Sequence, residues 1–283
     1  MSILDEIVRH KRQELAASKA ATPRRALEAR CATMPAPRDF ERALTPVPGR
    51  ARLVAEVKRA SPSRGVLKAD LDPVTLASTY AQNGVDAISV LTDAKYFRGS
   101  LDDLRAVRAA VDVPLLRKDF TVDEYQLWEA RAAGADAILL IVSILEAPLL
   151  SDLAAAAKGL GLAALVECHT AKELDVALAA GAPLIGINNR DLATFETRID
   201  ATVALMPHIP PGPTVVSESG FFNGDDVRRV IEAGAHAVLV GEGLVKAPDV
   251  AAKILELRLA GSAIPAEPGG TWGGRLDPPM VQQ

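Results

Sequence analysis

AGADAILLIV, residues 133–142, ends one amphipathic segment with a glycine and then starts a run of six apolar residues. Related junctions occur at NGVDA (83–87), AGAPL (180–184) and AGAHA (233–237). In each junction the glycine can adopt the left-handed conformation that ends a helix, and the apolar run that follows has the length of a buried strand. This weak internal repeat indicates strands that alternate with helices.

Apolar runs of strand length recur along most of the chain. The predicted strands are Leu53–Val57, Ala87–Leu91, Val113–Leu116, Ala137–Val142, Ala163–Val166, Leu184–Ile187, Thr214–Ser217 and Ala237–Val240. Amphipathic segments predict helices at Leu101–Ala110, Val122–Ala133, Ala171–Ala180 and Asp225–Ala233. Eight such strand–helix units predict an α/β fold, a closed (β/α)8 TIM barrel. A doubly wound open sheet is the alternative, and the lack of a GxGxxG string disfavours it.

The bulk composition excludes several classes of protein. The chain has 283 residues and a net charge of -4, so no excess of basic residues points to nucleic acid or an anionic membrane. No apolar run reaches the ~18 residues of a membrane span, and the charged amino-terminal segment is unlike a signal peptide. Cys31 and Cys168 are far apart, which is typical of reduced thiols. We therefore expect a cytoplasmic protein.

The two ends of the chain differ from the repeating middle. An apolar stripe that includes Ile3, Leu4 and Ile7 predicts an extra N-terminal helix capped by Ser2. Five prolines between residues 23 and 48 predict a linker that leads to the first strand. We expect one barrel domain over residues 1–260. Residues 261–283, rich in proline and glycine, predict a disordered tail in which Trp272 is the large side chain.

Charged and amide side chains stand at the ends of most predicted strands. They are Glu56, Lys58, Lys118, Glu167, Asn188, Arg190 and Glu218. Ionisable groups are costly in a buried sheet unless they face a shared pocket. Strand alternation points Glu56 and Lys58 to one side, the barrel interior. A structural ion pair between these two residues is the simpler interpretation.

Single residues among these suggest acid–base and anion chemistry. Desolvation or nearby cations would lower the pKa of Lys118 and suit it to general acid catalysis, whereas a surface lysine is the simpler reading. Arg190 has the fork geometry to bind an anion. Cys168 points the other way, toward the helices, and is expected to pack there.

Two glycine-bearing strand exits suggest a phosphate site. SESG (217–220) and GEG (241–243) follow the last two predicted strands. In many barrels the backbone N–H groups of these two loops cradle a phosphate. Glu242 would then turn its side chain away and offer its amide.

Together these strings resemble the indole-3-glycerol-phosphate synthase family of tryptophan biosynthesis, over roughly residues 2–258. The matching strings are EVKRASPSRG (56–65), SVLTD (89–93), KYFRG (95–99), RKDF (117–120), VE (166–167) with His169, GINNRDL (186–192), VSESG (216–220) and LVGE (239–242). The early helix lacks a tryptophan that some relatives carry, so closure over the substrate is expected to differ in detail.

The resemblance implies a carboxy-lyase that converts 1-(2-carboxyphenylamino)-1-deoxyribulose 5-phosphate to indole-3-glycerol phosphate, with no cofactor and no metal. It also implies the catalytic roles of the strand-end residues, with Lys118 as proton donor, Glu167 and Glu56 as bases and Lys58 as a second acid. The substrate-binding residues it implies are Ser61, Pro62, Phe97, Phe120, Leu192, Ser219, Gly220, Gly241 and Glu242. Contact with other tryptophan-pathway enzymes stays open.

Two other functions compete with this one. An isomerase that acts on phosphoribosyl anthranilate needs only the phosphate loops and leaves Lys118 and Glu167 without a task. A non-catalytic ligand-binding barrel has no use for buried charges that are costly to keep.

The segment Ser61–Gly65 is the best candidate for a loop that closes over the ligand.

Overall fold

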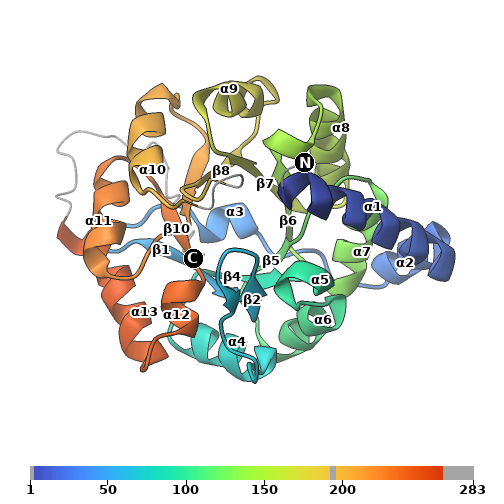
Figure 1. Cartoon of the computed structure of the whole chain (residues 1–283), viewed down its shortest axis with the longest axis horizontal. Helices are drawn as coiled ribbons and strands as arrows, with labels where there is room; N and C mark the ends of the chain where they lie inside the picture. Colours follow the sequence, from blue (N-terminus) through green and yellow to red (C-terminus); the bar gives the residue numbers. More distant parts are fainter. Residues whose placement is uncertain (1–2, 192–195, 264–283) are drawn as a thin grey trace, which may run out of the picture.

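A computed structural model of the chain describes residues 3–191 and 196–263. Within these ranges eight parallel strands close into a barrel in the order β1-β10-β9-β8-β7-β6-β5-β4. Figure 1 shows these strands at the centre, inside a ring of helices. The barrel strands are β1 (Arg52–Val57), β4 (Ala87–Leu91), β5 (Leu115–Lys118), β6 (Ala137–Ile141), β7 (Ala163–Cys168), β8 (Leu184–Asn188), β9 (Thr214–Glu218) and β10 (Ala237–Val240). The predicted TIM barrel is confirmed.

Helices follow the strands around the ring, and further elements cover the two ends of the barrel. The ring contains α4 (Pro73–Gln82), α6 (Leu101–Ala110), α7 (Tyr125–Ala133), α8 (Ala147–Gly159), α9 (Ala171–Ala179), α10 (Asp200–Leu205), α11 (Gly224–Glu232) and α13 (Val250–Leu259). The additional elements are α1 (Ile3–Ala21), α2 (Arg24–Ala32), α3 (Phe40–Ala43), α5 (Ala94–Phe97), α12 (Glu242–Val245), the short 3-10 helices η1 (Val142–Ile144), η2 (Met206–His208) and η3 (Ala260–Ala263), and the antiparallel hairpin β2 (Ala60–Ser61) and β3 (Gly65–Val66).

Strand alternation divides the core into two layers. Side chains such as Val54, Leu116 and Leu165 fill the barrel, while their neighbours pack outward under the helices. Cys168 belongs to the outer layer and is fully buried, so its predicted packing role is confirmed.

The segment predicted as a linker contains two helices, which the prediction missed. Its prolines lie outside the helices, and Pro23 directly precedes α2. Asp39 caps α3 by accepting a hydrogen bond from the backbone N–H of Arg42. Phe40 and Leu44 pack against residues that open the strands, such as Ala87 and Ala237. These two side chains therefore close the amino-terminal end of the barrel and leave the opposite end for a site.

Element boundaries differ from the prediction in a few places. β5 begins at Leu115 rather than Val113, since Pro114 has no N–H to donate to a neighbouring strand. It also ends later than predicted, so Lys118 is part of the strand. The N-terminal helix is confirmed, although Ser2 lies outside the described residues. The four junction glycines all have positive φ, as the repeat predicted. None of the helices in the described ranges combines the length and apolar composition that crossing a membrane requires.

Part of the predicted tail is outside the described ranges. The 3-10 helix η3 continues to Ala263, three residues beyond the predicted domain end, and Gly261 packs against the backbone of Ala51. Trp272 lies outside the described residues.

Candidate active site

A cavity that is open to solvent lies at the carboxyl ends of the strands. Every predicted site residue within the described ranges lines it, because strand ends converge there. Leu192 falls outside the described residues. The strands carry the functional groups themselves, since Lys118, Asn188 and Glu218 are each the last residue of a strand. Rigid strand ends are well suited to hold reacting groups in place.

Lys118 is the centre of the polar part of the cavity. Its Nζ lies 2.8 Å from Oε2 of Glu167 and 3.1 Å from Oε2 of Glu218. Burial disfavours the ammonium form, but the carboxylates of Glu167, Glu218 and Glu56 outweigh it, and the net effect raises the pKa of Lys118. The predicted lowering of this pKa is therefore wrong, because the nearest charges are anions. Lys118 is a fully charged ammonium at neutral pH.

The two carboxylates around Lys118 differ in their protonation. Glu167 also lies near His169, and although burial opposes ionisation, the cations Lys118 and His169 lower the pKa of Glu167. Burial, helped by the charge of Glu167, raises the pKa of Glu218 to about 7 against the pull of Lys118. The arrangement therefore holds one ionised carboxylate and one that gains a proton near neutral pH.

A second ion pair lies beside this cluster. Nζ of Lys58 is 2.5 Å from Oε2 of Glu56, so the two side chains face the same cavity, as alternation predicted. An ideal Cβ on Gly241 would lie 2.4 Å from that same Glu56 oxygen. The close approach of β10 to this pair requires a glycine at position 241.

Arg190 connects the cavity to the β2–β3 hairpin. The side-chain oxygen of Asn188 accepts a hydrogen bond of 3.0 Å from the backbone N–H of Arg190, which orients the residue. The guanidinium donates to the hydroxyl of Ser63 and lies 3.8 Å from the carboxylate of Glu242. The hairpin loop predicted to close over a ligand is therefore already attached to the cavity rim.

The two predicted phosphate loops lie next to each other at this rim. Ser219 and Gly220 both have positive φ, so the backbone turns sharply after β9. Glu242 begins α12, and its carboxylate lies 2.8 Å from Nζ of Lys246 and 3.6 Å from Nε of Arg64. The Glu242 carboxylate therefore lies among cations at the cavity rim, whereas a bound phosphate was predicted to require this side chain to turn away.

The opposite wall of the cavity is apolar. The rings of Phe97 and Phe120 lie 6.1 Å apart between centroids, and Pro62 lies on the same cavity surface. Ile3, Leu4 and Ile7 of α1 complete the lining. Their spacing predicted an apolar face of a helix, but it did not predict that this face lines the site. A stripe at this spacing predicts an apolar face without saying which surface it covers.

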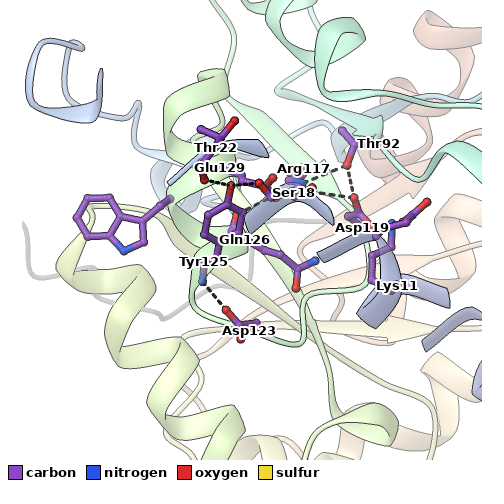
Figure 2. Close-up of polar contacts among 12 residues, drawn as sticks. Lys11, Ser18, Thr22, Thr92, Arg117, Asp119, Asp123, Tyr125, Gln126 and Glu129 are labelled. Atoms are coloured by element: carbon purple, nitrogen blue, oxygen red, sulfur yellow. Dashed lines mark hydrogen bonds and ion pairs between the residues drawn. The ribbon is translucent and has the colours of Figure 1, made fainter. Parts of the chain in front are cut away.

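Lys11 fixes α1 over the cavity, a role that the sequence did not predict. This side chain is only 6% exposed, and its Nζ lies 2.9 Å from both Asp93 and Asp119. Figure 2 shows Lys11 beside Asp119, which is also bound by Thr92 and Arg117. Burial alone would raise the pKa of the Asp119 carboxyl. The cations Arg117 and Lys11 outweigh this effect and lower the pKa to about 2.

The carboxylate of Asp119 connects α1 to the site. Asp119 follows Lys118 directly, and its side chain accepts a 2.8 Å hydrogen bond from the backbone N–H of Phe120. Further along α1, the hydroxyl of Tyr125 donates to the carbonyl oxygens of Ser18 and Thr22 (Figure 2). The helix is therefore held at two places, one of which adjoins the proposed proton donor.

Solved structures and known sequences place this architecture in context. The chain superimposes on 3-hexulose-6-phosphate synthase from Salmonella typhimurium with a TM-score of 0.60, covering 75% of this chain and 98% of that one at 14% identity, which supports the barrel fold alone.

The indole-3-glycerol phosphate synthase family model matches residues 4–257. Indole-3-glycerol phosphate synthase of Roseiflexus sp. (strain RS-1) is 49% identical over 90% of this chain and 98% of the relative. The protein of the same name from Roseiflexus castenholzii is 50% identical with the same coverage. With this near-complete match, the chain belongs to the indole-3-glycerol phosphate synthase family.

Proposed function

We propose that the chain converts 1-(2-carboxyphenylamino)-1-deoxyribulose 5-phosphate to indole-3-glycerol phosphate, carbon dioxide and water. The observation that carries the proposal is Lys118, held between Glu167 and Glu218 in a cavity with an apolar wall and a cationic rim. That cavity matches an aromatic substrate with a phosphate at its far end. The family membership of the chain supports the same reaction.

The substrate spans the cavity from its apolar wall to its rim. Its aromatic ring lies by Phe97 and Phe120, under the side chains of α1. Its phosphate lies by the loops at Ser219–Gly220 and Gly241–Glu242, where backbone amides, Lys58 and Arg190 are available. The phosphate replaces the Glu242 carboxylate near Arg190, and Lys246 keeps Glu242 paired. Neutralising a phosphate with an arginine fork also fixes its position.

Ring closure is the first chemical step. The ring carbon that bears the carboxylate attacks the ketone of the ribulose chain, and the ketone oxygen gains negative charge. The Lys118 ammonium stabilises this charge and donates its proton, since an alkoxide is a stronger base than a lysine amine. A positioned acid of this kind contributes roughly 10²–10⁴-fold in rate. The raised pKa of Lys118 keeps the proton available at neutral pH.

Decarboxylation and dehydration complete the reaction. Loss of carbon dioxide returns its bonding electrons to the ring and restores aromaticity. The new hydroxyl then leaves as water after it gains a proton, and a base removes the proton that the five-membered ring loses. We assign Lys58 as the second acid and Glu167 and Glu56 as bases; their ion pairs in the same cavity support this assignment. Each of these groups lines the same cavity, within reach of one bound substrate.

A product assay tests the proposal. Purified protein is incubated with the carboxyphenylamino-deoxyribulose phosphate while indole fluorescence and released carbon dioxide are followed. A Lys118→Ala preparation, purified identically, measures any contaminating activity. Equal amounts of indole product and carbon dioxide are expected from the wild type.

Two other results would overturn the proposal. Phosphoribosyl anthranilate is supplied in a parallel reaction, and its isomerisation without any indole product would identify an isomerase. Tight binding of the first substrate with no product would identify a non-catalytic barrel.

A further inference from the structure

His169 lies directly behind the proposed base, and the reaction described above gives it no role. It follows β7 immediately and is separated from Glu167 by one residue, so both side chains project to the same side. Only 12% of the His169 side chain is exposed. A histidine that is buried beside a functional carboxylate calls for a physical explanation.

Glu173 fixes the orientation of the imidazole ring. One of its oxygens, Oε2, accepts a 2.7 Å hydrogen bond from the backbone N–H of His169 and lies 3.2 Å from Nδ1 of the ring. Glu173 is itself positioned by the start of α9, where its backbone N–H donates to Thr170. Helix α9 therefore determines where the second ring nitrogen points.

The second ring nitrogen lies next to the Glu167 carboxylate. Nε2 of His169 lies 3.5 Å from Oε1 of Glu167, while the other oxygen of Glu167 contacts Lys118. Nε2 is buried and has no hydrogen-bond partner among the described residues. A neutral ring that donates from Nδ1 to Glu173 would present a lone pair to the Glu167 carboxylate. An imidazolium donates from both nitrogens and suits both carboxylates.

We propose that His169, oriented by Glu173, is a positioning residue that stays protonated and keeps the Glu167 carboxylate ionised and aligned with Lys118. The proposal rests on the proposed function, in which Glu167 acts as a base. The imidazolium supplies a second cation to Glu167, on the side that Lys118 does not reach.

The charges around the ring support this role. The groups that face it are Glu167 from β7, Glu173 from α9, Glu218 from β9 and, across Glu167, Lys118 from β5. The neighbouring 3-10 helix η1 contributes no titratable side chain. Burial disfavours the imidazolium, but Glu173 and Glu167 outweigh it and raise the pKa of His169. A carboxylate therefore lies near each of the two ring nitrogens.

Proton NMR of the wild-type protein tests the protonation state directly. The chain has four histidines, so a His169→Gln variant identifies the His169 signal by its loss. We expect His169 to titrate above the ordinary pKa of histidine, and a Glu173→Gln variant to lower that pKa by about one unit. Titration at or below the ordinary value in the wild type would overturn the proposal. This readout needs no turnover, so it is independent of whether the proposed reaction occurs.

The pH profile of kcat/KM separates charge from simple support. Without the imidazolium the apparent pKa of the Glu167 cluster rises, so the acid limb of kcat/KM moves up by about one unit in His169→Gln. Activity then recovers at alkaline pH. Asp175→Asn removes an exposed negative charge from α9, the helix that carries Glu173, and this control is expected to keep the wild-type profile. An equal loss at every pH, or an unshifted limb, would contradict the role of His169.

Discussion

At the scale of single residues, the site is a balance between buried charges of opposite sign. Three carboxylates, from Glu56, Glu167 and Glu218, share the cavity with Lys58 and Lys118. All three carboxylates are nearly inaccessible to solvent. Burial, together with the charge of Glu167, raises the pKa of Glu218 to about 7, and the attraction of Lys118 does not offset this rise. Buried carboxylates that lie this close together reduce the stability of the fold.

Glu218→Gln is expected to stabilise the protein at high pH while it slows turnover. A carboxyl whose pKa rises from 4.5 to about 7 on folding binds more protons in the folded state, so its contribution to stability is lost as pH rises through that window. Glutamine does not titrate, so the variant does not lose stability in this way as the pH rises. Its free energy of unfolding relative to wild type should therefore increase by roughly 3 kcal/mol between acidic and alkaline pH.

Urea denaturation at a series of pH values measures this difference. Glu232→Gln, an exposed substitution on α11, serves as the control and should track the wild type. A Glu218→Gln curve that stays parallel to the wild-type curve at all pH values would refute the proposed charge balance.

Gly186→Ala is expected to damage the site more than the fold. A Cβ at position 186 would lie 2.2 Å from Oε1 of Glu218, so the carboxylate must move. A displacement of about 1 Å can cost on the order of 100-fold in rate. Steady-state kinetics should show a fall of this size in kcat/KM. Gly159→Ala, where a Cβ meets nothing within 4 Å, is the matched control and should keep full activity.

At the scale of elements, α1 is as much a part of the site as the strands. Its apolar side chains line the cavity, and Lys11 joins it to the loops after β4 and β5. Asp119 carries that connection to Lys118 and Phe120. Movement of α1 would therefore disturb both the aromatic wall and Lys118, the proposed proton donor.

Lys11→Met is expected to leave Asp93 and Asp119 without their shared cation. Removing one partner of a buried ion pair typically costs about 3–5 kcal/mol, so the free energy of unfolding should fall by that amount. Lys19→Met removes an exposed pair with Asp123 and should cost less than about 1 kcal/mol. Denaturant unfolding gives both values, and hydrogen exchange shows whether α1 opens first. Equal effects of the two substitutions would count against Lys11 as an anchor.

Elements of the repeating middle were largely predictable, whereas the irregular segments were not. Hydrophobic runs located the strands because a buried strand is a short apolar run, and glycines marked four of the junctions that precede them. The helix α3 was missed since it spans only four residues, and α2 was missed because the prolines around both helices indicated a linker. Tertiary packing of Leu27 and Phe40, invisible in local sequence, stabilises these two helices.

At the scale of the whole molecule, barrel closure is what made the site predictable. Closure gathers the ends of strands that are far apart in sequence, so polar residues at strand ends must meet. The same reasoning cannot give distances. The sign of the Lys118 pKa shift depended on carboxylates from β1, β7 and β9, and the position of α1 depended on one buried lysine. Both are properties of the assembled barrel.

The most direct test of the account is the single-turnover rate of Lys118→Arg, with enzyme in excess over the carboxyphenylamino-deoxyribulose phosphate. Arginine keeps the positive charge between Glu167 and Glu218 but does not give up a proton. The account predicts that substrate affinity is retained while the rate falls roughly 10²–10⁴-fold. A rate close to that of the wild type would contradict Lys118 as the proton donor.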